Sequence, residues 1–294
     1  MPFSYRDETK ELNEVTRREA SGSFIQLSDG FTHYELSNPQ AQETVVLIHG
    51  FSVPYLIFDP TFEFLTDSGF RVLRYDLFGR GYSDRPETKY NIDLFVRQLR
   101  ELLDGLGFTP PVHLVGLSTG GPISAVFTER YPERVRKLVL IDPVGAKPFA
   151  LGRALKVMAM PFVGETIISL LGIGGMTRIS STEAAIRLYA DRILPGYIMQ
   201  MKYKGFKRAI LSTIRNDMLA SFIGAYEHIG KLNKPVLLFW GPEDRTVPFK
   251  HSEILRTVMP GVQFHAIEHT GHIPHYEKPA EVNPILLEFL RAER

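Results

Sequence analysis

Short apolar runs alternate with amphipathic stretches along most of the chain from Thr44 onward. The apolar runs are rich in β-branched residues and predict buried strands near 44–49, 70–76, 111–117 and 135–142. The stretches between them have helical spacing near 59–68, 91–107 and 120–131. This alternation predicts an α/β protein, with a mostly parallel, doubly wound sheet that has helices on both faces.

The N-terminal region precedes the alternation. Residues 1–20 are charged and compatible with a helix, and we expect an appended arm there. Two strand-like runs at 23–27 and 31–36 flank the turn-forming segment 28–30, which predicts a β-hairpin.

The alternation stops after Asp142 and resumes at Pro235. The residues between are rich in helix-forming residues, and most of the methionines lie there: Met158, Met160, Met176, Met199, Met201 and Met218. Flexible thioethers suit a surface that contacts variable apolar ligands. We expect a core over 21–144 and 231–294, and a helical cap over 145–230 inserted after the sixth strand.

One pentapeptide, 116–120, has the pattern G-x-S-x-G and lies between a predicted strand and a predicted helix. In this context the pattern places Ser118 on a sharp turn with its hydroxyl exposed. Gly116 and Gly120 leave room for that turn because they have no Cβ. The free N–H groups at the start of the helix would face an anion that forms above the serine. Ser118 is therefore a candidate nucleophile.

A serine nucleophile needs a base, and the base needs a carboxylate to orient it. Asp244 lies in a polar turn after the apolar run 235–240, and His272 follows the strand-like run 262–267. The chain order Ser, Asp, His is the order of α/β-hydrolases. We expect Ser118, Asp244 and His272 to form a catalytic triad.

Other residues compete for these roles. Asp142 ends the predicted strand 135–142 and is an alternative acid, although Pro143 after it favours a turn. Glu243 is expected to be solvated. His269 and His275 lie three residues on either side of His272, but the intervening glycine and proline interrupt a helix, so we expect no metal site and place both in a loop or facing the cap.

Three further segments resemble hallmarks of one family. Residues 45–51 resemble the strand and H-G turn of the oxyanion hole, 74–84 resemble the segment D-x-x-G-x-G-x-S, and 271–279 resemble G-H-x(4)-E-x-P. With the G-x-S-x-G turn, the chain resembles an α/β-hydrolase over nearly its whole length. Within that superfamily it resembles the branch of serine carboxylesterases and monoacylglycerol lipases.

The resemblance implies an activity and the residues that perform it. The backbone N–H groups of Phe51 and Thr119 would form the oxyanion hole, and Asp76 would be structural. Each oxyanion donor contributes on the order of 3 kcal/mol. We expect a serine hydrolase that cleaves esters of small to medium apolar acyl groups through an acyl-enzyme, without cofactor or metal.

Two other functions stay open. Hydrolases of carbon–carbon bonds in aromatic breakdown typically have G-N-S-x-G-G and a tryptophan after the catalytic histidine, whereas this chain has Leu117 and Ile273 there, so we rank that activity second. A slow-turnover ligand receptor of the same fold is the third. If the apolar stretch 157–173 lines the acyl pocket, Ile167 and Leu170 should contact long acyl chains.

Charge and composition narrow the partners and the location. A net charge of +1 excludes a field that would recruit nucleic acid, and the absence of cysteine excludes thiolate chemistry. The segment 1–8 has no apolar leader, so we expect a cytoplasmic protein. Glu165 within 157–173 argues against a membrane span. Cations at 202–215 interleave with aromatic residues, a pattern that favours a solvated helix face first, and transient contact with anionic lipid or acidic substrates through the cap second: Lys202, Lys204, Lys207, Arg208 and Arg215.

Overall fold

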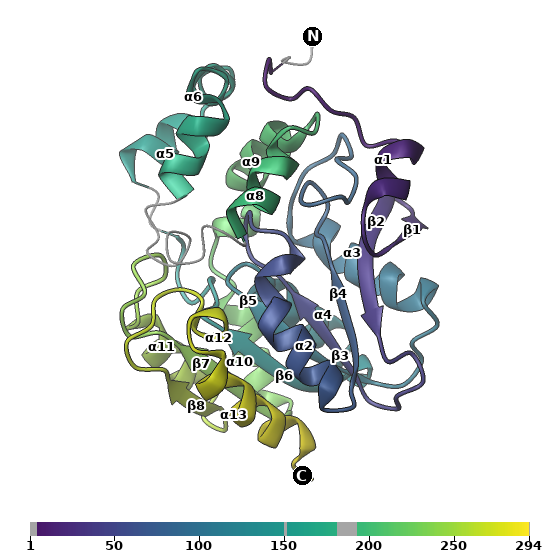
Figure 1. The fold of residues 1–294 in the computed structure, drawn as a ribbon. Helices are drawn as coiled ribbons and strands as arrows, with labels where there is room; N and C mark the ends of the chain where they lie inside the picture. The colour runs from purple at the N-terminus through teal and green to yellow at the C-terminus, as the bar shows by residue number, and fades with distance from the viewer. Residues whose placement is uncertain (1–4, 150–151, 181–192, 294) are drawn as a thin grey trace.

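The computed structural model describes residues 5–149, 152–180 and 193–293. A single sheet in the order β1-β2-β4-β3-β5-β6-β7-β8 runs through it (Figure 1). Its strands are β1 (Ser23–Leu27), β2 (Gly30–Ser37), β3 (Thr44–Ile48), β4 (Arg71–Tyr75), β5 (Val112–Leu117), β6 (Val135–Ile141), β7 (Val236–Trp240) and β8 (Gln263–Ala266). The hairpin β1–β2 joins β4 in antiparallel fashion, and β3 to β8 pair in parallel. The predicted fold class is confirmed.

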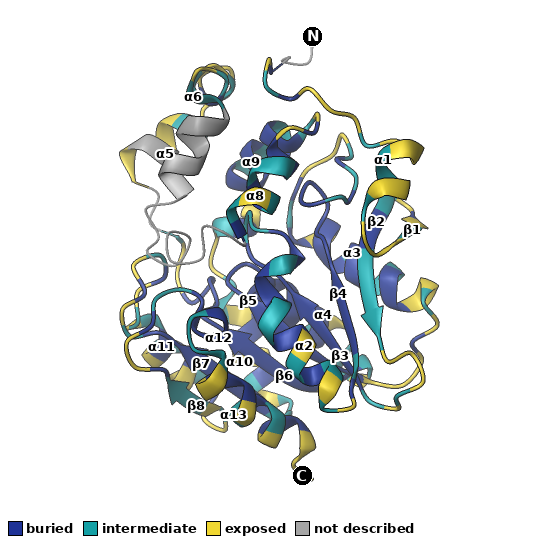
Figure 2. Ribbon diagram, viewed as in Figure 1, coloured by how far each residue is buried: buried dark blue, intermediate teal, exposed yellow. Residues whose placement is uncertain are grey.

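Helices cover both faces of this sheet. On one face lie α3 (Ile92–Gly105), α4 (Gly120–Arg130) and α10 (Ile223–Lys231), and α11 (His251–Val258) packs beside α10. On the other face lie α2 (Asp59–Asp67), α12 (Pro274–Glu277) and α13 (Pro279–Arg291), next to the short 3-10 helix η1 (Tyr55–Phe58). Successive residues of β3 enter opposite cores, because side chains alternate along a strand. This two-sided burial explains why the strands are continuous apolar runs (Figure 2).

A helical layer lies between β6 and β7 in sequence and beyond the carboxyl edge of the sheet in space (Figure 1). It contains α5 (Arg153–Met158), α6 (Val163–Ser180), α8 (Ile193–Met201), α9 (Phe206–Arg215) and η3 (Asp217–Leu219). The layer has an apolar core of its own, formed by residues such as Ile168, Met201 and Phe206. We propose that this layer is the cap. The predicted range 145–230 also includes α10, which packs against α4 instead.

The N-terminal arm connects the cap to the sheet. The helix α1 (Glu14–Glu19) lies near the hairpin, and Arg17 contacts Asp84 at 2.7 Å. Upstream, the Glu8 carboxylate accepts hydrogen bonds from the backbone N–H groups of Gly205 and Lys207 at 2.7 and 2.8 Å. The arm therefore holds α9 through a buried acid.

Most of the cations considered for contact with anionic lipid form ion pairs within the chain. Lys207 is buried and contacts Asp7 at 2.5 Å, and Lys204 pairs with Glu11. Arg215 pairs with Glu165 at 2.5 Å. Within the described residues, the helices are too short or too polar to span a membrane. The cap surface thus provides less free positive charge than its sequence predicted.

Candidate active site

Ser118 lies on the sharp turn from β5 into α4 and has a φ of +54°. Few residues other than glycine adopt such a backbone, so the turn is strained. Two glycines make it sterically feasible: a Cβ on Gly116 would lie 2.4 Å from the Gly120 carbonyl oxygen, and one on Gly120 would lie 2.2 Å from that of Ile48. The Ser118 N–H donates to the Ile141 carbonyl at 2.9 Å, which anchors the turn to β6.

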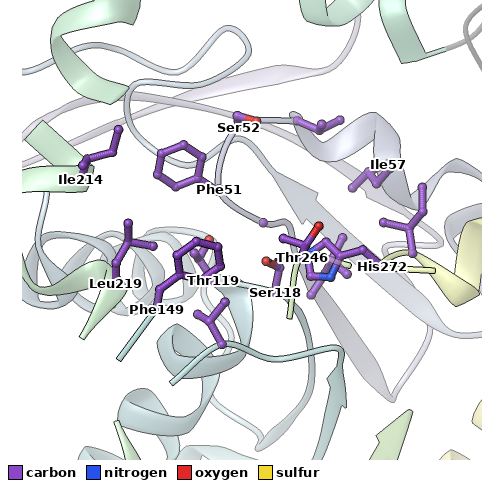
Figure 3. A pocket seen from close by; sticks show the side chains of 15 residues that line it. Phe51, Ser52, Ile57, Ser118, Thr119, Phe149, Ile214, Leu219, Thr246 and His272 are labelled. Carbon is purple, nitrogen blue, oxygen red and sulfur yellow. Dashed lines mark hydrogen bonds between the residues drawn. The ribbon is translucent and has the colours of Figure 1, made fainter. Parts of the chain in front are cut away.

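The structure brings the three residues of the predicted triad together. The Ser118 Oγ lies 2.9 Å from His272 Nε2, and His272 Nδ1 lies 2.7 Å from Asp244 Oδ2. Figure 3 shows the imidazole beside the serine hydroxyl, at the wall of a cavity. In this geometry His272 can remove the hydroxyl proton while Asp244 holds the imidazole orientation.

Backbone groups fix the Asp244 carboxylate. Its Oδ1 accepts hydrogen bonds from the N–H groups of Thr246 and Val247, at 2.7 and 2.9 Å. The other oxygen, Oδ2, stays directed at His272. Hydrogen bonds from N–H donors favour the ionised carboxylate, the form that an imidazolium needs opposite it.

The loop that carries His272 is held by Glu277. The Glu277 carboxylate accepts hydrogen bonds from the N–H groups of Gly271 and Ile273, at 2.9 and 3.2 Å. The acid thus clamps the residues on both sides of the histidine. This role of Glu277 was not predicted from the sequence, although its fixed spacing from His272 in G-H-x(4)-E-x-P was the available signal.

The two predicted oxyanion donors line the same cavity as Ser118. Thr119 is the N-cap residue of α4, and Phe51 lies in the loop between β3 and η1. His49 holds that loop: its Nδ1 donates to the Gly50 carbonyl at 2.8 Å, and its Nε2 accepts from the Leu77 N–H at 2.9 Å. Burial lowers the pKa of His49 to about 4, so this imidazole is neutral and purely structural near pH 7.

A buried arginine, missed from the sequence, lies behind the oxyanion loop. Arg80 Nε donates to the Phe51 carbonyl at 2.8 Å, and Nη2 donates to Thr213 Oγ1 of the cap at 2.9 Å. Burial lowers the pKa of Arg80 to about 10, so the guanidinium stays charged near pH 7. It therefore joins the oxyanion loop to the cap, and its only sequence signal is its place in the D-x-x-G-x-G-x-S segment.

Of the competing acids, Asp142 lies within 4.8 Å of Asp244 and His272, whereas Glu243 is exposed at the surface. Asp142 accepts from the Gly241 N–H at 2.9 Å, and His272 makes its short contact with Asp244. Glu243 is exposed beside His269, at 3.5 Å, as expected for solvated groups.

His275 corrects a prediction. We expected it in a loop or facing the cap, but it is fully buried and its Nε2 donates to the Ile57 carbonyl at 3.2 Å. The helix α12 turns this side chain toward η1, below the site. Asp76 is buried and accepts from the N–H groups of Tyr55 and Tyr82, in keeping with a structural role.

The cavity above Ser118 has a volume of about 190 Å³ and a mainly apolar lining. Its lining includes Phe51, Ile57, Leu117, Val144, Phe149, Ile214, Leu219 and Ile273. Figure 3 shows Phe149, Leu219 and Ile214 on the side of Ser118 that faces away from His272. Ile57 lies on the His272 side.

Our assignment of the cap residues in this pocket was wrong. Leu170 is 82% exposed and, like Ile167, does not line the cavity. The described methionines do not line it either: Met201 and Met218 are buried in apolar cores, and Met160 is exposed. The side chain of Met176 lies outside the described residues. The other side chains point into the protein or toward solvent, and away from the site.

Comparisons with known proteins identify the family of this chain. A profile of the alpha/beta hydrolase fold family matches residues 43–279. This chain belongs to the alpha/beta hydrolase fold family.

Several members of the family are similar over nearly the whole chain. The 2-hydroxy-6-oxononadienedioate/2-hydroxy-6-oxononatrienedioate hydrolase 1 of Pseudomonas putida is 27% identical, over 95% of this chain and 99% of that protein. The 2-hydroxy-6-oxo-6-phenylhexa-2,4-dienoate hydrolase of Comamonas testosteroni is 27% identical, over 90% and 93%. A meta-cleavage product hydrolase of Pseudomonas fluorescens IP01 has a TM-score of 0.74 and 26% identity, over 92% of this chain and 97% of that one.

Proposed function

We propose that this alpha/beta hydrolase cleaves a carbon–carbon bond next to a ketone, through an acyl-enzyme on Ser118. The observation that supports this most is the Ser118–His272–Asp244 arrangement facing an apolar cavity, in a chain similar along nine-tenths of its length to hydrolases named for such ketones. These similarities reverse our ranking, which put ester cleavage first because of Leu117 and Ile273.

The first step is the same for a ketone and for an ester. The Ser118 Oγ bonds to the carbonyl carbon while its proton passes to His272 Nε2, 2.9 Å away. The carbonyl oxygen becomes an oxyanion, and the N–H groups of Phe51 and Thr119 would stabilise it. Asp244 stabilises the imidazolium that results.

The second step separates the two activities. When the carbonyl re-forms, the bond from that carbon to the leaving group breaks, and the leaving group receives a proton. An oxygen leaves readily, whereas a carbon leaves only if its electron pair is delocalised. In the dienoates of the relatives' substrate names the carbon next to the ketone belongs to a C=C bond, so the proton of the 2-hydroxy group must first move to that carbon, which gives a 2-oxo-3-enoate. The electron pair released on cleavage is then delocalised onto the 2-oxo oxygen, which takes up the proton. Water then attacks the acyl-enzyme, His272 takes its proton, and Ser118 is released.

The geometry of the cavity favours an apolar acyl substituent. His272 delivers the proton to the leaving group, so the leaving group lies on its side of Ser118 and the retained acyl substituent lies on the other. That other side is formed by Phe149, Leu219 and Ile214 (Figure 3). A phenyl ketone fits such a wall better than an acyl chain that ends in a carboxylate, because burying a charge without a partner is costly.

Ester hydrolysis is the second candidate, and one observation favours it. Among the described residues that line the cavity there is no lysine or arginine to pair with a dienoate carboxylate. A neutral ester needs no such partner. The third possibility, a slow ligand receptor, would bind without steady turnover.

Two ketone substrates test the proposal. We expect wild type to release benzoate from 2-hydroxy-6-oxo-6-phenylhexa-2,4-dienoate with a higher kcat/KM than it releases succinate from 2-hydroxy-6-oxononadienedioate. Ser118→Ala is the control and should release neither. Steady turnover excludes the receptor, and a preference for the dioate would contradict the assignment of the apolar wall.

A further inference from the structure

We infer that Asp142 is a positioning residue for the triad: it remains a neutral carboxylic acid and donates a hydrogen bond to Asp244. The two carboxyl groups then hold one proton between them. This inference rests on the proposed function, because it assigns a role behind the same Ser118–His272 pair.

The two acids lie side by side in a dry part of the protein. One ligand atom each of Asp142, Asp244 and His272 lies within 4.8 Å of the others. Asp142 is fully buried and Asp244 is 7% exposed. Two buried carboxylates at this separation repel each other strongly, so one of them keeps a proton.

The hydrogen bonds decide which acid holds the proton. Asp244 accepts from two backbone N–H groups and faces His272, all of which favour its charge. Asp142 accepts from one donor, the Gly241 N–H, and among the described residues no N–H or O–H group donates to its buried Oδ2. A proton on Asp142 gives that side chain a donor for its neighbour. Burial and the charge of Asp244 raise the pKa of Asp142 well above its ordinary value.

The other titratable groups around the pair do not supply an alternative counter-charge. His251 begins α11 and faces Asp244, and burial lowers its pKa with help from the charge of Lys147. His275 lies on α12, three residues beyond His272, and burial lowers its pKa to about 3. Both are neutral near pH 7, so His272 is the cation that Asp244 stabilises.

The backbone at Asp142 supports a matched pair of variants. Its φ is +42°, a conformation that asparagine and glycine tolerate better than most residues. In Asp142→Asn the amide oxygen can still accept from Gly241, and the amide nitrogen can still donate to Asp244. Asp142→Gly removes both groups without backbone strain.

The experiment measures labelling of Ser118 by a fluorophosphonate against pH, which reports on the Ser118–His272 pair whatever the natural substrate. We expect Asp142→Asn to label within about twofold of wild type at every pH. In Asp142→Gly the charge of Asp244 is no longer shared, so it holds the imidazolium more tightly. The midpoint of the acidic side of the labelling profile should therefore rise by about one pH unit. At a pH below the midpoints of both proteins, Asp142→Gly should label about tenfold more slowly than wild type.

Three results would overturn the inference. Asp142→Asn that labels as slowly as Asp244→Asn would mean that Asp142 works as an anion. If the midpoint of the profile stays the same in Asp142→Gly, whether or not the labelling rate falls equally at every pH, the role of Asp142 is only structural. If wild type does not label at all, the proposed function itself is overturned. This outcome differs from the first two, in which wild type labels and only the role of Asp142 fails.

Stability measured against pH gives a second readout that does not depend on activity or on the glycine variant. The raised pKa of Asp142 means that the folded protein retains a proton which the unfolded chain releases above about pH 3.9. Wild type should therefore lose stability relative to Asp142→Asn as the pH rises from 4 to 8. A difference that stays constant over this range would contradict a neutral Asp142.

Discussion

The carboxyl edge of the sheet and the cap form opposite walls of one cavity, and they are built on different physical principles. The edge holds Ser118, His272 and Asp244 in hydrogen bonds of 2.7 to 2.9 Å. Backbone groups fix the serine turn and the Asp244 carboxylate, and Glu277 fixes the loop of His272. The cap wall is formed by apolar side chains such as Ile214 and Leu219. Apolar contacts, unlike hydrogen bonds, do not require a fixed orientation of the ligand. On the proposed function, the edge would determine the chemistry, and the cap wall would determine which acyl group fits.

This contrast predicts different sensitivity to substitution. Changes at the edge should abolish turnover for every substrate, because the polar groups act as a unit. Changes in the cap wall should alter the ranking of substrates, because apolar contacts contribute roughly in proportion to buried area.

The largest effect is expected at the nucleophile. Ser118→Ala should lower kcat by about 10⁵-fold or more on ketones and esters alike, because no other group can form the acyl-enzyme. Wild-type thermal stability would show that the variant folds. Measurable turnover of either substrate class would place the nucleophile elsewhere and remove the distinction between the two walls.

Asp244→Asn is the next strongest change. The amide cannot hold the imidazole in its correct tautomer, so kcat should fall by about 10⁴-fold. The matched control is Asp142→Asn in the same assay, which should retain most of its activity. The reverse ranking would mean that the acid belongs to β6 and not to the turn after β7.

Most of the sheet and the triad could be predicted from the sequence because they follow local rules. The turn at Ser118 needs glycine on both sides, and buried strands need apolar runs. Arg80 could not be found in this way, since it joins Phe51 to Thr213, 133 positions further along the chain. The cap wall was misassigned for a related reason: composition does not reveal which face of a helix turns toward the site, and Leu170 turns outward.

A smaller effect, on the free energy of unfolding, is expected at a buried ion pair in the core of the protein. His33 Nδ1 lies 2.7 Å from Asp76 Oδ2, and both side chains are 2% exposed. Burial alone would lower the pKa of His33, but the hydrogen bond and charge of Asp76 outweigh it and the net shift is upward. The resulting stability is complete below the unfolded value of about 6.5 and is lost as the pH rises through the folded value.

Replacing this histidine should therefore have a pH-dependent cost. We expect His33→Gln to lower the free energy of unfolding by about 1–3 kcal/mol at pH 5.5, and by less as the pH rises toward 9. Denaturant unfolding at several pH values measures the trend. A cost that does not change with pH would show that His33 is held as a neutral side chain.

The smallest effects are expected in the cap. Ile214→Ser and Leu219→Ser should each lower kcat/KM on the phenyl ketone by about tenfold, while acetate esters lose little. Leu170→Ser is the control, because that side chain is 82% exposed and lies outside the cavity. Equal losses on both substrates would show that the wall supports the fold and does not select the acyl group.

The central claim is that this site cleaves a carbon–carbon bond, and a pair of substrates with one acyl group tests it most directly. Both 2-hydroxy-6-oxo-6-phenylhexa-2,4-dienoate and p-nitrophenyl benzoate would place a benzoyl group on Ser118, and they differ in whether carbon or oxygen leaves. We predict that kcat/KM for benzoate release is higher from the ketone, although its leaving group is intrinsically worse. Benzoate release from the ester alone would contradict the claim and make this alpha/beta hydrolase an esterase.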